Sequence, residues 1–230
     1  MKRSTAEHTT KTTPRITIRY LWQEVLSTLS WDKGIFFTIK ELLIRPGEAI
    51  HKYLAGERKR YSNPIRFLVL VTTIASFITI KLDLFRRLLS ENSSPSNEGD
   101  QQFVQDMILF LYQYYNIIMF LSVPLLAVLT YLFFRRWGYN YAEHLTLSAF
   151  LSAEYMVLYL FIIVGVYYQP LLFNNIGLVA WFGYIVWALV SLFPGKKWKV
   201  IGKGILISIL QFLFSIMIGG VLALVYISLR

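Results

Sequence analysis

The sequence contains no cysteine. This absence excludes disulfide bonds, thiolate catalysis and metal centres with cysteine ligands. Charged residues are also scarce: they make up 16% of the 230 residues, whereas soluble domains carry roughly 25%. With hydrophobic residues at 56%, the chain lacks the polar surface that a soluble domain of this length needs. The composition therefore predicts an integral membrane protein.

Acidic residues are absent from the last third of the chain, because none follows Glu154. The net charge is +10, and residues 1–66 carry 13 lysine and arginine residues against six acidic ones. Cationic residues beside apolar segments stay on the cytoplasmic side of a membrane and attract anionic lipids. We therefore expect membrane lipids with anionic head groups, and no nucleic acid, as partners of this basic region.

The fold class predicted from the hydrophobic pattern is an all-α integral membrane protein with about five transmembrane helices. About 20 apolar residues in a helix cross a hydrocarbon core roughly 30 Å thick. The uncharged part of the first candidate, residues 67–80, is shorter than this, so Arg66 and Lys81 must reach the interface with their long side chains. The five predicted spans are residues 65–84, 110–134, 144–168, 171–193 and 204–229.

The basic clusters predict the orientation of these spans. Besides the amino-terminal region, Arg135 with Arg136 and the lysines at 196–203 should all be cytoplasmic. An even number of crossings must then separate each cluster from the next, and five spans satisfy this condition. We expect a multi-pass protein with its N-terminus in the cytoplasm and its C-terminus outside.

The region before the first span is predicted to be helical and amphipathic. Residues 1–15 are read as a disordered tail, 16–63 as cytoplasmic or interfacial helices, and 64–230 as the membrane bundle. Helical spacing of apolar residues covers 16–29 and 35–44. These helices either lie in the lipid interface or pack on the cytoplasmic ends of the bundle.

Proline and asparagine mark helix starts in the same region. Pro46 suits the first position of a short helix that runs to residue 54, with Gly56 as its stop. Asn63 and Pro64 repeat the signal, with asparagine as the N-cap and proline as the first helical residue.

A candidate polar site lies within the membrane. Its residues come from the third span and the fifth: Glu143, His144, Ser148, Glu154, Tyr155 and Gln211. An ionised Glu154 near mid-membrane costs several kcal/mol unless it is paired, hydrated or protonated. It is either a protonated structural group bonded to Gln113, Asn116 or Gln211, or a proton-handling group in transport. Glu143 and His144 should form a solvated pair near the cytoplasmic boundary.

Two further groups of residues are candidates for contacts. The basic residues Arg45, Arg58, Lys59, Arg60 and Arg66 could bind lipid phosphate, although general attraction to anionic lipid explains them as well. Small residues on the fifth span permit close helix packing, within the chain or with a protein partner or second copy. This stripe consists of Gly204, Ser208, Ser215, Gly219 and Ala223. No catalytic motif, metal site or cofactor is predicted.

Residues 42–64, which contain Arg45-Pro46-Gly47 and Tyr61-Ser62-Asn63-Pro64, together with Tyr141-Ala-Glu-His144, carry a family resemblance. The sequence resembles a family of uncharacterised multispanning membrane proteins, common in Bacteroidetes and known as a domain of unknown function. Many members begin with a cysteine-rich zinc ribbon, which this cysteine-free sequence does not contain. The resemblance implies a bacterial inner membrane and supplies no catalytic residues.

Three functions are consistent with these patterns. The leading hypothesis is a non-enzymatic scaffold, accessory or lipid-interacting component of the inner membrane. The alternatives are a small proton-coupled transporter that uses Glu154, and a membrane enzyme that acts on lipid head groups near Glu143 and His144.

Overall fold

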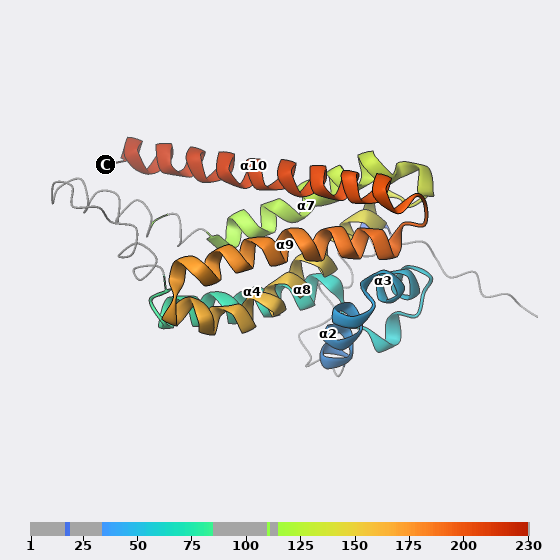
Figure 1. The fold of residues 1–230 in the computed structure, drawn as a ribbon, viewed down its shortest axis with the longest axis horizontal. Helices are drawn as coiled ribbons and strands as arrows, with labels where there is room; N and C mark the ends of the chain where they lie inside the picture. Colours follow the sequence, from blue (N-terminus) through green and yellow to red (C-terminus); the bar gives the residue numbers. More distant parts are fainter. Residues whose placement is uncertain (1–16, 19–33, 85–109, 111–114, 230) are drawn as a thin grey trace, which may run out of the picture.

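The computed structural model describes residues 17–18, 34–84, 110 and 115–229 (Figure 1). The expected tail over 1–15 and nearly all of the expected helix over 16–29 lie outside these ranges. The elements are α2 (Ile35–Ile44), α3 (Pro46–Leu54), η1 (Arg58–Arg60), α4 (Pro64–Lys81), α7 (Tyr115–Phe134), η2 (Arg135–Trp137), α8 (Tyr141–Tyr168), α9 (Pro170–Leu192) and α10 (Lys197–Leu229).

Five of these helices, α4, α7, α8, α9 and α10, are long and apolar enough to cross a membrane. The predicted all-helical class with five helices able to cross a membrane is therefore confirmed for the described residues. Three helix ends within the described residues differ from the predicted spans by three residues or more. The helix of the first span ends at Lys81 instead of residue 84, α8 begins at Tyr141 instead of 144, and α10 begins at Lys197 instead of 204. A Cβ added to Gly204 would lie 3.3 Å from Cγ2 of Val186 on α9, so this part of α10 packs closely on that helix.

Helix α8 is the centre of the bundle, since it packs against α4, α7 and α9, while α10 packs on α7 and α9. Figure 1 shows α10 along one edge of the bundle. Large apolar side chains cover the outer faces, among them Phe161 at 72% exposed and Val179 at 71%. Such surfaces are unfavourable in water and suit contact with lipid.

Helices α2 and α3 with η1 form a collar, a name used here for residues 35–60. The collar lies at the end of the bundle opposite the C-terminus (Figure 1). Helix α3 packs on the bundle and buries Ala49, Ile50 and Tyr53. Helix α2 leaves Phe36 at 80% exposed and Ile44 at 56%. Of the two arrangements predicted for the 35–44 helix, α2 shows features of both: it packs against α3 and α8 and buries Thr38 and Leu42, whereas its outer face keeps the apolar character of an interfacial helix.

Helix α3 of the collar begins and ends at the residues that the sequence predicts, and helix α4 of the first span begins at its predicted start. Pro46 is the first residue of α3, and Gly56 after that helix has a φ of 110°, in the left-handed region that favours glycine. Asn63 caps α4: its Oδ1 accepts hydrogen bonds from the backbone N–H of Ile65 at 3.0 Å and of Arg66 at 3.1 Å. These predicted starts and stops are confirmed.

Close backbone approaches fix the collar in position. A Cβ added to Gly47 would lie 2.3 Å from the carbonyl carbon of Ser191, and the Gly47 N–H donates to Ser191 Oγ at 2.9 Å. A Cβ on Gly34 would lie 2.9 Å from the carbonyl oxygen of Arg60. Thr38 Oγ1 accepts a hydrogen bond from the buried Ser62 N–H at 2.7 Å. The collar is thus joined to the end of α9 and to the start of α4.

Candidate functional site

Helix α8 begins with a capping box. Asn140 Oδ1 accepts from the Glu143 N–H at 2.9 Å, and Glu143 Oε2 accepts from the Asn140 N–H at 2.7 Å. These bonds satisfy backbone donors that a helix start otherwise leaves unpaired. Glu143 is only 5% exposed, so its predicted solvated position is wrong. The Asn-x-x-Glu spacing was visible in the sequence and accounts for this residue as a helix cap.

His144 is enclosed, at 1% exposed, and its prediction as a solvated interfacial residue is wrong. Its Nδ1 lies 3.1 Å from Thr130 Oγ1, and Phe193 lies nearly parallel to its ring, with centroids 6.1 Å apart. Tyr131 and Tyr139 approach the same ring edge-on. Helix α7 and the chain segments after α7 and α9 cover this histidine with aromatic rings, which sequence periodicity within one helix does not reveal.

Tyr139 connects this aromatic cluster to the collar. Its Oη lies 2.8 Å from Nδ1 of His51 on α3. Burial raises the pKa of Tyr139 above its ordinary value, so the phenol is protonated at neutral pH. Glu143 is bound in the capping box at the start of α8, and His144 is buried beneath aromatic rings. Neither side chain is therefore accessible to a lipid head group. The head-group enzyme hypothesis therefore finds no geometric support at this pair.

Glu154 is completely buried, and neither carboxyl oxygen has a hydrogen-bond partner. The bond predicted as possible with Gln211 is not formed, and Gln211 Oε1 is itself buried without a partner. Gln113 and the side chain of Asn116, the other predicted partners, lie outside what the structure describes. Ser148 is fully buried too, with an unpartnered hydroxyl. Of the predicted polar site, these three residues keep unused hydrogen-bonding capacity, as does His144, whose Nε2 is also buried without a partner.

Tyr155 has a structural partner instead. Its Oη donates to the carbonyl oxygen of Gly177 on α9 at 3.3 Å, and its ring meets Trp181 edge-on with centroids 4.7 Å apart. The sequence analysis included Tyr155 in the candidate polar site and missed Tyr184. This residue of α9 is 6% exposed, and its hydroxyl has no hydrogen-bond partner. As one of 15 tyrosines in an apolar span, Tyr184 carried no distinguishing signal.

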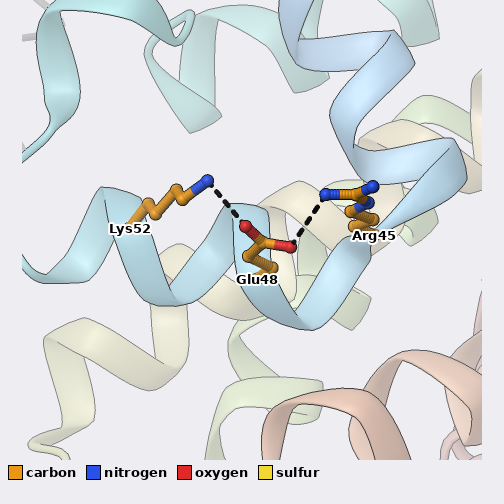
Figure 2. Close-up of polar contacts among 3 residues, drawn as sticks. All are labelled: Arg45, Glu48 and Lys52. Atoms are coloured by element: carbon orange, nitrogen blue, oxygen red, sulfur yellow. Dashed lines mark ion pairs between the residues drawn. The ribbon is translucent and has the colours of Figure 1, made fainter.

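The basic candidates separate into two groups. Arg45 lies 3.5 Å from Glu48, which in turn lies 2.7 Å from Lys52 (Figure 2). The hydrogen bond and charge of Lys52 lower the pKa of Glu48, so this acid is ionised and offsets one of the two positive charges beside it. The positive charge of the collar is therefore concentrated on η1, which consists of Arg58, Lys59 and Arg60. Arg66 follows on the first turn of α4 and is half-buried.

Lys203 also has a role that the sequence did not indicate. It was expected only as one of the cytoplasmic lysines; its Nζ donates to the carbonyl oxygen of Phe133 at 2.7 Å and lies 5.0 Å from the centroid of Phe134. A cation at the end of a helix pairs with the last carbonyl groups and with the helix dipole. Lys203 thus caps α7.

The small-residue stripe of α10 divides in two. Gly204 faces Val186, and Ser208 is fully buried, so the first half packs within the chain. Ser215, Gly219 and Ala223 are only half-buried, and a Cβ on Gly219 would meet nothing within 4 Å.

Comparison with known proteins gives one match. Residues 32–76 match a domain described as "Protein of unknown function (DUF3667)". No curated protein and no solved structure matches the chain. The matched residues include the whole collar and α4 as far as Ser76. The segment that the family model identifies is therefore the collar together with most of the first membrane helix.

Proposed function

We propose that this chain is a non-enzymatic protein of a bacterial inner membrane whose collar contacts anionic lipid on the cytoplasmic side, in a scaffold or accessory role. This proposal rests on the combination of positive charge and exposed apolar side chains in the collar. Three consecutive cations form η1, and Arg60 lies 4.8 Å from the ring centroid of Phe37 on α2. The same helix exposes Phe36 and Ile44.

The orientation follows from the distribution of charge. The basic residues of η1, the arginines of η2 and the lysines that begin α10 belong to helix ends separated by pairs of spans. Basic residues at membrane boundaries favour the cytoplasm. In this arrangement the N-terminus is cytoplasmic, the C-terminus is outside, and η1 meets the anionic leaflet.

Removing the three charges of η1 is expected to weaken the preference for anionic lipid. Each lysine or arginine near such a surface contributes about 1 kcal/mol, so three contribute on the order of a 100-fold preference. The variant carries Arg58→Gln, Lys59→Gln and Arg60→Gln in the full chain. Binding of spin-labelled phosphatidylglycerol and phosphatidylcholine to the reconstituted protein gives the preference directly.

A control with the same loss of charge separates collar binding from general attraction. Arg135→Gln, Arg136→Gln and Lys199→Gln remove three charges on the same predicted side. We expect this variant to keep most of the preference for phosphatidylglycerol. Equal losses in both variants, or no loss in the first, would show that the collar has no special contact with anionic lipid.

A further inference from the structure

Two basic turns of the chain lie together at the same end of the bundle as the collar (Figure 1). The first is η2, which follows α7, and the second leads from α9 into α10. The rings of Phe134 and Phe193, at the bases of these turns, stack with centroids 4.1 Å apart. Trp137 also approaches the second turn, since a Cβ added to Gly195 would lie 3.6 Å from its Cζ2. Aromatic packing therefore holds the two turns in a fixed arrangement.

Residues 135–137 and 196–199 of these turns form what we call the cationic surface. Five of its residues are lysine or arginine and the other two are tryptophan, and all of them are exposed. Within the part of the chain that the structure describes, none of these cations forms an ion pair. Glu143, the acidic residue that follows η2 most closely, is held in the capping box of α8. The charge of this surface is therefore available to a partner.

The length of α10 places the lysines of this surface beyond the lipid head groups. Its 33 residues span about 50 Å at roughly 1.5 Å per residue, whereas a bilayer with its head groups is about 40–45 Å thick. An average tilt of about 20° shortens this span only to about 47 Å. The residues of α10 after Lys203 carry no charge and suit the hydrocarbon core, so the excess length falls at the basic end. Lys197 and Lys199 are therefore expected to face water.

We propose that the cationic surface binds an acidic segment of a soluble cytoplasmic protein. Carboxylates of the partner would be complementary in charge to the lysines and arginines. Exposed Trp137 and Trp198 supply apolar contact area of the kind that is enriched in protein interfaces. This inference rests on the cytoplasmic orientation proposed above, and it gives the scaffold or accessory role a binding surface. Anionic lipid is the competing occupant, but the lysines extend past its head groups.

The test measures binding of a fluorescein-labelled glutamate-rich peptide with a few leucines to the purified full-length protein. Fluorescence anisotropy follows binding in a neutral detergent and in nanodiscs of zwitterionic phosphatidylcholine. The control peptide has glutamine at every glutamate position. We expect saturable binding of the acidic peptide alone in both media, with an affinity that falls as salt screens the charges.

Variants of the full chain assign this binding to the cationic surface. Replacing its three lysines together, as Lys196→Gln, Lys197→Gln and Lys199→Gln, should weaken binding about tenfold, because several exposed ion pairs of modest strength are lost at once. Trp198→Ala should weaken it about fivefold, the effect of removing one aromatic contact. The collar variant described above, which lacks the three charges of η1, is the matched control and should keep its affinity for the peptide.

Equal losses in the lysine variant and the collar variant would overturn the proposal, because general attraction to a basic protein would then explain the binding. No binding in detergent, or undiminished affinity in Trp198→Ala, would overturn it as well. Binding in detergent that is lost in phosphatidylcholine nanodiscs would assign the surface to lipid head groups instead. These outcomes are independent of the collar's preference for phosphatidylglycerol, so the failure of either proposal can be recognised separately.

Discussion

Replacing Gly47 by alanine is expected to lower the free energy of unfolding by about 3 kcal/mol and to release the collar from the bundle. The new methyl group would lie 2.3 Å from the carbonyl carbon and 2.4 Å from the carbonyl oxygen of Ser191. Backbone cannot rotate away as a side chain can, so α3 must move. Its movement also breaks the hydrogen bond from the Gly47 N–H to Ser191 Oγ. Overpacking costs 1–3 kcal/mol, and a lost hydrogen bond at a packed site adds about 1 kcal/mol.

Thermal unfolding and limited proteolysis check this result together, because a released α3 exposes new cleavage sites in the collar. Gly202→Ala is the matched control, since a Cβ at that helical position meets nothing within 4 Å. We expect the control to unfold at the temperature of the unmodified protein or slightly above, because alanine favours helix. Equal stability of the two variants would contradict the close approach of α3 to α9.

Phe150→Ala is expected to destabilise the protein by about 3–5 kcal/mol, the usual cost of emptying a buried phenylalanine site. Phe150 is 1% exposed, and its ring meets Tyr53 of α3 edge-on with centroids 4.9 Å apart. Such aromatic pairs add about 0.5–1.5 kcal/mol beyond the burial of area. The substitution therefore removes a contact that joins the central helix to the collar, as well as core volume.

The matched control on the same helix is Phe161→Ala, because Phe161 is 72% exposed on the outer face. Its truncation should change the unfolding temperature little. Denaturation of both variants in the same detergent gives the comparison. A small loss for Phe150→Ala, similar to that of the control, would mean that α8 and the collar are not packed as described.

The parts of the fold that depend on local chemistry could be predicted from the sequence. Asn63 before Pro64 marks an N-cap and a first helical residue wherever the chain goes next, and the structure has both. Pro46 and Gly56 likewise mark the start of α3 and the turn that follows it. Uncharged length predicted five spans because a membrane imposes a minimum helix length.

Contacts between segments that are far apart in the sequence could not be predicted from local patterns. Gly47 was predicted only as the second residue of a short helix, while its packing also requires space for Ser191, 144 residues later. Lys203 looked like a topological charge, yet it caps α7. His144 was expected to be solvated because the covering ring of Phe193 follows a different helix. Each of these roles depends on how helices pack, which one helix's periodicity does not specify.

The candidate site could be predicted only in part, because it also depends on how the helices pack. A lone acid in a long apolar run predicts burial, and Glu154 is buried. Its neighbour could not be chosen from the sequence, because the register between α8 and α9 decides which side chain it meets. The predicted bond to Gln211 is not formed, because the helix packing leaves the Glu154 carboxyl oxygens and Gln211 Oε1 buried without hydrogen-bond partners.

The orientation of the collar is the central claim, and single cysteines test it directly because the chain has none of its own. Lys59→Cys lies on the exposed surface of η1, and Gln169→Cys lies on the exposed turn between α8 and α9. Both variants are treated with a membrane-impermeant thiol reagent in intact bacterial cells whose outer membrane has been made permeable. We expect labelling of Gln169→Cys alone, with Lys59→Cys labelled only after lysis. Labelling of Lys59→Cys in intact cells, or of both variants from the same side, would contradict a cytoplasmic collar on a bundle of five spans.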